Sequence, residues 1–231
     1  MGIGDIRFTL LQTVNELLRK LDLNTVTSLT TNKLTKQMVD FINDVCNDLS
    51  DYGNWQENIV SSNVTAVSGQ SDYSIATSAN IKNIADIYFS TRSGALRNLT
   101  VQDMRIQTRV TSVGTPTQYS IFGTDSNGNP NLRVKPVPGA SEDGKLFSVV
   151  YYIRTPQYTT ADTNVVIPFP GKLVVDGVHA MILLNESGGA ANNQYTQKYN
   201  SYLQARKEAL NRFNGDSGWE ISFVPSGRRR R

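Results

Sequence analysis

The side chains that most often carry catalysis or bind metal ions are scarce in this sequence of 231 residues. It has one histidine, His179, and one cysteine, Cys46. Zinc sites use about three or four His, Cys or carboxylate ligands, so the sequence does not indicate a usual zinc site. Cys46 falls on a helical pattern of apolar residues, which indicates a small buried side chain, and a single cysteine excludes an internal disulfide. His179 lies in an apolar helical stretch, where we expect it to be packed or part of an interface.

The segment Gly215-Asp216-Ser217-Gly218 resembles the sequence around the nucleophilic serine of chymotrypsin-like proteases. Those proteases place that serine late in a double β-barrel, with the catalytic histidine far upstream. Here the segment follows the last expected helix, and the single histidine belongs to a helical stretch of a different fold class. We therefore interpret the segment as a polar turn after a helix.

Other candidate motifs also have simpler interpretations. Asp125-Ser126-Asn127-Gly128 has its glycine too early for a calcium loop and lacks the closing glutamate, whereas Asn-Gly is typical of a hairpin turn. Glu142 and Asp143 lie in a loop rich in Gly, Ser and Pro, which favours solvated carboxylates. No phosphate-binding G-x-x-x-x-G-K-[ST] sequence occurs. We therefore expect no enzyme, and no catalytic, cofactor-binding or metal-binding residues.

Helical periodicity occurs at both ends of the chain. Apolar residues at steps of three and four predict an amphipathic helix over Ile3–Leu21, and Thr31 or Asn32 can cap a second helix that ends at Gly53. After Pro170 the pattern predicts two more helices, one from Leu173 to Asn185 and one over Ala190–Phe213. Four helices with apolar stripes need one another to bury those stripes.

The middle of the chain, from Trp55 to about Pro168, shows short β-branched and aromatic runs separated by turn residues. Within it, Val101–Val110 alone has a helical pattern. The predicted strands are Asn58–Val67, Tyr73–Ile75, Ile84–Ser90, Thr117–Phe122, Leu132–Val137, Leu146–Tyr152 and Asn164–Ile167. We therefore predict an α+β fold: a four-helix bundle from residues 1–54 and 169–214, an antiparallel β-sandwich or barrel-like insertion at 55–168, and an extended C-terminal arm at 215–231.

Charge is concentrated at the C-terminus. The formal net charge is +3, but removing Arg228–Arg231 leaves 19 basic against 20 acidic residues, or −1. The basic character therefore belongs to the arm rather than to a nucleic-acid-binding face. We see no secretory or targeting signal and no apolar run long enough to cross a bilayer, so we expect a protein that stays in the cytosol and out of the membrane.

Several segments together resemble a known family. Each is weak alone, but their order and spacing are specific. In chain order they are Trp55, Ser71–Ile75, Ile84–Phe89, Leu96–Thr100, Gly114–Tyr119, Leu132–Pro138, Val150–Pro156 and Val166–Pro170. From about Leu34 to Phe213 the chain resembles the tail adaptor proteins, or head-to-tail connectors, of short-tailed and related bacteriophages.

This resemblance implies a structural virion protein of the neck and tail. Such adaptors form a ring, commonly of twelve copies, that joins the portal protein to the tail nozzle or tail tube and lets genomic DNA pass without specific binding. Assembly would take place in the host cytoplasm. Family members often reach the portal with C-terminal arms, so we expect a portal-binding arm, flexible until assembly, formed by Trp219, Ile221, Phe223, Val224, Arg228, Arg229, Arg230 and Arg231.

Two other functions stay open at this point. The tyrosines of the β-rich middle could make a carbohydrate-binding or decoration module, and scattered carboxylates could serve a virion-associated cell-wall hydrolase. The tyrosines in question are Tyr73, Tyr88, Tyr119, Tyr151, Tyr152 and Tyr158. The flanking helices argue against the first alternative, because a freestanding lectin sandwich does not need them.

Overall fold

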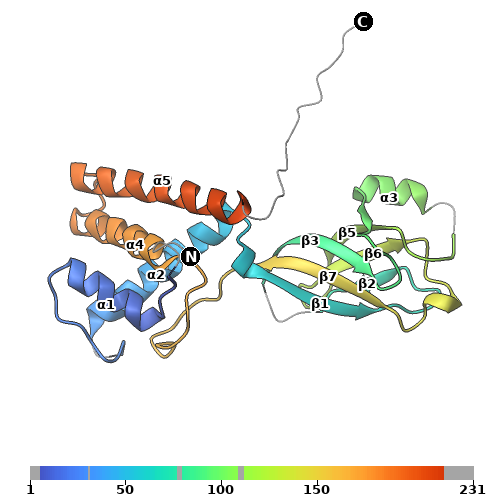
Figure 1. Cartoon of the computed structure of the whole chain (residues 1–231), viewed down its shortest axis with the longest axis horizontal. Helices are drawn as coiled ribbons and strands as arrows, with labels where there is room; N and C mark the ends of the chain where they lie inside the picture. The colour runs from blue at the N-terminus through green and yellow to red at the C-terminus, as the bar shows by residue number, and fades with distance from the viewer. Residues whose placement is uncertain (1–5, 31, 77–79, 109–111, 216–231) are drawn as a thin grey trace, which may run out of the picture. The chain divides into compact units, whose positions relative to one another are not determined.

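The computed structural model describes residues 6–30, 32–76, 80–108 and 112–215 and has an α+β fold (Figure 1). Five α-helices and two β-sheets occur among these residues. The chain divides into a helical unit, Met1–Glu57 with Thr155–Arg231, and a β unit, Asn58–Arg154. The expected boundaries at residues 55 and 168 differ from this division, because residues 55–57 and 155–168 belong to the helical unit.

The first helix is shorter than the periodicity predicts. Helix α1 spans Leu10–Lys20 and begins with a capping box, in which Thr9 Oγ1 accepts from the Gln12 N–H and Gln12 Oε1 accepts from the Thr9 N–H. Residues 6–8 lie outside the helix, and Ile6 is 59% exposed. The predicted start at Ile3 is therefore wrong for the described residues before Thr9, because the cap ends the helix there.

The other three helices of this unit follow the sequence prediction closely. Asn32 caps α2, Lys33–Tyr52, by accepting from the Thr35 N–H at 2.8 Å, and Gly53 ends it. Helix α4 spans Gly171–Glu186 and α5 spans Asn193–Gly215. Gly188 and Gly189 between them have φ of 68° and 83°, which glycine adopts without strain.

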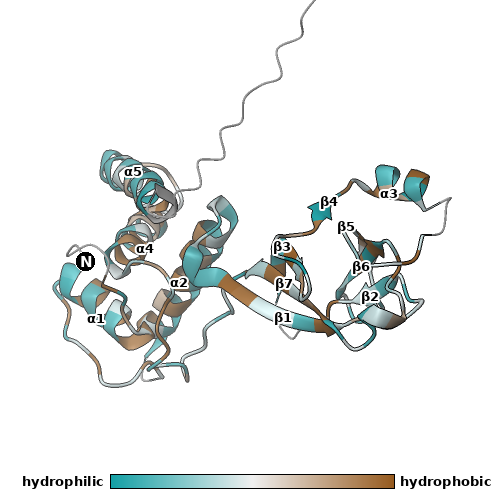
Figure 2. Ribbon diagram, turned by 45° about the vertical axis from the view of Figure 1, so that its right-hand side comes forward, coloured by the Kyte–Doolittle hydropathy of each residue, from teal (hydrophilic) through white to brown (hydrophobic). Residues whose placement is uncertain are grey.

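One hydrophobic core joins these four helices. Helix α4 is buried over most of its surface, whereas α5 carries mostly hydrophilic residues (Figure 2). Gly177 lets α4 approach its neighbours closely: a Cβ there would lie 2.8 Å from Tyr202 Cε2 and 2.9 Å from Val45 Cγ1. The fully buried Trp55 packs edge-on against Phe169, with ring centroids 5.3 Å apart, and donates from Nε1 to Leu49 O at 2.7 Å.

The segment after the β unit runs along the helices rather than in a sheet. The predicted strand Asn164–Ile167 is wrong: Val166 forms only an isolated bridge with Thr9. Nearby backbone bonds join Leu10 N to Val165 O at 2.9 Å and Ile167 N to Phe8 O at 3.0 Å. Of the predicted strand only Ile167 is buried, in the core of the helices, whereas Val165 and Val166 are 42% and 54% exposed.

The β unit contains two sheets. The first has the order β1-β7-β3 with antiparallel neighbours, and the second has the order β2-β6-β5-β4, in which only β4 and β5 are parallel. The strands are β1 Ile59–Thr65, β2 Asp72–Ser74, β3 Ile81–Phe89, β4 Arg97–Asn98, β5 Gln118–Thr124, β6 Pro130–Lys135 and β7 Leu146–Ile153. The described strands form no closed barrel, so the barrel-like alternative is wrong.

Side chains of both sheets contribute to a second hydrophobic core, separate from that of the helices. Phe147 lies at its centre, with ring centroids 4.8 Å from Phe89 and 5.2 Å from Tyr73. The predicted hairpin at Asp125–Pro130 connects β5 to β6, with Gly128 at φ 81°. The predicted helix at Val101 is α3, Val101–Gln107, capped by Thr100.

Candidate functional site

The predicted portal-binding residues lie outside the described part of the chain. This holds for Trp219, Ile221, Phe223, Val224 and Arg228–Arg231, and also for Asp216–Gly218 of the protease-like segment. Gly215 is the last residue of α5. The arm therefore stays a sequence-based prediction.

The single cysteine and the single histidine lie in the helical core or at its edge. Cys46 is buried, and burial raises the pKa of its thiol well above the usual range, which makes the reactive thiolate rare. His179 is half-buried on α4, where desolvation and then the charges of Lys20 and Lys198 lower its pKa. Among the described residues, no group of three or more His, Cys, Asp or Glu side chains could hold a metal ion.

The two loop carboxylates differ in their surroundings. Asp143 is exposed, as expected, but Glu142 is only 5% exposed, so the prediction of a solvated side chain is wrong for it. Glu142 accepts hydrogen bonds from Ser141 Oγ at 2.8 Å, Thr115 Oγ1 at 2.9 Å and the Gly139 N–H at 3.2 Å, and these bonds lower its pKa. Its role is to hold the loop together.

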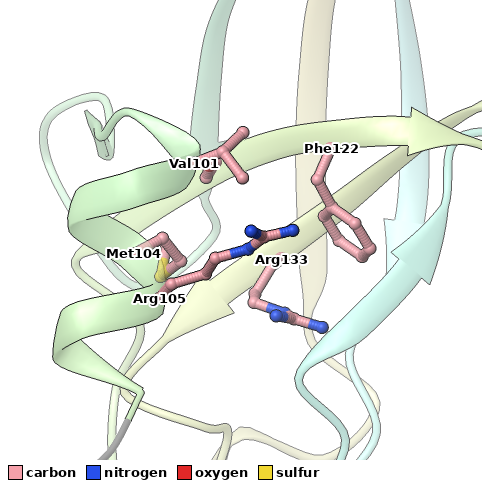
Figure 3. A pocket seen from close by; sticks show the side chains of 6 residues that line it. Val101, Met104, Arg105, Phe122 and Arg133 are labelled. Atoms are coloured by element: carbon pink, nitrogen blue, oxygen red, sulfur yellow. The ribbon is translucent and has the colours of Figure 1, made fainter.

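A pocket of about 230 Å³ lies between α3 and the second sheet of the β unit (Figure 3). Helix α3 contributes two side chains one turn apart, Val101 and Arg105, together with the buried Met104 that anchors the helix. Strand β5 contributes Ser120 and Phe122, which alternate onto the same face. Strand β6 contributes Arg133, the register partner of Ser120.

Arg133 is held in a fixed position. Its Nε and Nη2 atoms each donate to a different oxygen of Asp72 at 2.6 Å, and its guanidinium lies 4.5 Å from the centre of the Phe122 ring. This bidentate hydrogen bonding is the largest cause of the lowered pKa of Asp72. A planar guanidinium that is bonded on one edge and stacked on an aromatic ring keeps its remaining N–H groups in place.

Two other polar groups of the pocket lack partners within the described part of the chain. The Arg105 side chain reaches from α3 into the pocket, towards Phe122 and Arg133, and forms no ion pair there (Figure 3). The Ser120 side chain is 1% exposed, and its Oγ has no hydrogen-bond partner. The pocket thus combines positive charge with an unpaired hydroxyl.

Comparison with known protein families identifies the chain. A family model described as SU10 adaptor protein matches residues 8–220, which includes both units. The chain belongs to the SU10 adaptor protein family. It is therefore a phage structural adaptor and a virion component, which confirms the resemblance at the level of the family. No curated protein matches the chain.

Four of the six tyrosines considered for a ligand platform are buried. Tyr73, Tyr119, Tyr151 and Tyr158 are each at most 5% exposed and lie in the two cores, while Tyr88 is 39% exposed. A carbohydrate-binding face needs several exposed aromatic rings on one surface, so this burial weighs against the lectin-like alternative.

Within the described residues, no helix is both long and apolar enough to cross a membrane.

The sequence could not have revealed the pocket of the adaptor. Its residues come from one helix and two strands, spaced over Val101–Arg133, and they meet only in the folded unit. The available signal was indirect: Arg133 lies in the segment Leu132–Pro138 that carried the family resemblance. No spacing rule links it to Arg105 or Ser120.

Proposed function

We propose that this adaptor is a head-to-tail connector: it forms a ring that joins the portal to the tail nozzle or tail tube and lets DNA pass. The observation that carries the proposal is the family match over residues 8–220, which spans the helices and the β unit alike. The ring would hold about twelve copies, as in the resembling connectors. It would assemble in the host cytoplasm and end in the neck of the virion.

The helical unit and the β unit suggest two separate structural roles. The four helices, packed as a bundle, would form the body of the ring, because they share one core. The β unit, with its sheets as the layers of a sandwich, has its own core and would contact neighbouring subunits or the tail. Separate cores support separate roles, since neither unit needs the other to bury its apolar side chains.

The C-terminal arm would attach the ring to the portal. Trp219, Ile221, Phe223 and Val224 are costly to leave in water, at about 25 cal/mol per Å² of apolar surface, and a protein cleft would remove that cost. Arg228–Arg231 would add charge complementarity at the rim of the contact. Buried aromatic side chains often dominate such interfaces.

DNA would pass through the ring without being held. Without Arg228–Arg231 the chain has a net charge of −1, so it offers little positive charge to bind the phosphates of a duplex. We expect the ring without its arm to show no tight, salt-sensitive binding of duplex DNA in a filter-binding assay. Tight binding would contradict a freely conducting channel.

Arm variants test the attachment. Deletion of Ser217–Arg231, and separately Trp219→Ala with Phe223→Ala, should leave the fold unchanged but abolish attachment to portal-bearing heads. Ser222→Ala with Ser226→Ala is the matched control in the same arm and should attach normally. Attachment of the deletion variant at the wild-type level would rule out the arm as the anchor.

A further inference from the structure

The pocket between α3 and the second sheet contains a buried hydroxyl group that has no hydrogen-bond acceptor among the described residues. Buried hydroxyl groups in proteins nearly always have a partner, yet Ser120 Oγ has none among the described residues. Arg105 and Arg133 line the same space, and guanidinium groups only donate hydrogen bonds. A group that accepts hydrogen bonds from both kinds of donor and carries negative charge would satisfy all three residues together.

The size and lining of the pocket restrict what carries that charge. Its volume of about 230 Å³ is below the roughly 300–1,000 Å³ of sites for drug-sized ligands. Val101, Met104 and Phe122 make much of the wall apolar. One acidic side chain with an apolar neighbour fits these features, whereas a sugar-phosphate backbone offers less apolar surface to match them.

The unequal states of the two arginines also favour a carboxylate. Arg133 already binds Asp72 through two N–H groups. Its other N–H groups can still donate, but the Arg133–Asp72 pair carries little net charge. Arg105 has no acidic partner in the described part of the chain. One added carboxylate would therefore neutralise Arg105 and complete the bonding of Ser120.

We propose that this pocket binds the side chain of an aspartate or glutamate, next to an apolar residue, presented by another protein chain. The partner carboxylate accepts from Arg105 and Ser120, and its apolar neighbour covers Val101, which is 38% exposed. The pocket is then a contact point through which the β unit recognises a protein partner. This assignment does not depend on the position of the adaptor in the neck.

A titration of the full-length protein tests the proposal directly. The probe is acetyl-Glu-Leu-amide, and the signal is the Met104 methyl resonance, which Met104→Leu identifies among the four methionines. We expect a saturable shift, with acetyl-Gln-Leu-amide binding about tenfold or more weakly because it lacks the charge. The signals of the buried Met38 and the half-buried Met181 report that the helical unit is intact.

Variants then assign the effect to the pocket. Arg105→Gln should remove the preference for the glutamate peptide, and Ser120→Ala should weaken its binding, whereas the exposed Arg92→Gln in the same unit should change neither. Equal binding of both peptides would overturn the proposal. Binding of a thymidine dinucleotide through Arg105, at the strength of the glutamate peptide, would overturn it too, because phosphate would then be the ligand.

Discussion

At the scale of single residues, Asn43 connects α2 to the chain that returns from the β unit. Its side-chain amide donates to Tyr158 O at 2.9 Å and accepts from the Tyr158 N–H at 2.8 Å, and all of these groups are buried. Removing the amide leaves two buried backbone groups unpaired. A pattern of apolar spacing cannot reveal such a residue, because Asn43 occupies a core position of the helix as an exception to the pattern.

We predict that Asn43→Ala lowers the free energy of unfolding by about 2–4 kcal/mol, since each unsatisfied buried group costs about 1–3 kcal/mol. Urea denaturation followed by circular dichroism measures this. Asn47→Ala, one turn further along α2, is the control: Asn47 accepts from Gln157 at 3.2 Å in an exposed position, and its loss should cost no more than about 0.5 kcal/mol. Equal losses for both variants would contradict the role given to Asn43.

Asp72 and Arg133 provide a test by pH. The hydrogen bonds from Arg133 lower the pKa of Asp72, so Arg133→Gln should raise it towards its ordinary value of about 3.9. The ion pair stabilises the fold at pH values above that ordinary value, and this contribution disappears as the pH falls through the lowered pKa. Both partners are partly exposed, so the contribution to stability is modest.

The measurement is an NMR titration of the Asp72 side-chain carbon in wild type and Arg133→Gln. Arg97→Gln, an exposed arginine of the same unit, serves as the control and should leave the Asp72 midpoint unchanged. A midpoint that is the same in wild type and Arg133→Gln would show that the bond with Asp72 does not hold Arg133 in the pocket.

At the scale of elements, sequence periodicity predicted well which segments form helices and strands. It failed where local hydrogen bonds determine the start of an element or the pairing of a segment. Apolar steps of three and four gave the four helices of the helical unit, yet they extended the first one over Ile6, because spacing alone does not register the Thr9–Gln12 cap. Alternation predicted a strand at Asn164–Ile167, which pairs with the chain before α1 instead. The burial of Glu142 was likewise unpredictable, since it depends on Thr115 from a separate loop.

Gly177 is the position where helix packing outweighs helix propensity. Alanine would favour an isolated helix by about 1 kcal/mol, but its Cβ would lie within 3 Å of Tyr202 and Val45. We predict that Gly177→Ala lowers the melting temperature, because overpacking of a core costs about 1–3 kcal/mol. Gln197→Ala at an exposed site of α5 is the control and should leave the melting temperature nearly unchanged. Stabilisation by Gly177→Ala would mean that the helices can move apart freely.

At the scale of the whole molecule, the boundaries of the two units lead to opposite outcomes for two similar deletions. Replacing Asn58–Arg154 by a short Gly/Ser linker keeps Trp55, Tyr158 and Ile167 in the helical core, so the remaining chain should fold and unfold cooperatively. Deleting residues 55–168 removes all three and should give an unfolded or aggregated product. Circular dichroism during heating distinguishes them, and equal stability of the two products would contradict the observed division.

The account as a whole rests on the adaptor forming a ring that binds a portal. The most direct test is native mass spectrometry of the full-length chain, alone and mixed with the portal protein of the same phage, with images of the mixture. We predict a complex of one portal ring with a closed ring of adaptor subunits, commonly twelve, which dissociates when Ser217–Arg231 is deleted. A chain that stays monomeric in the presence of assembled portal rings would contradict the account.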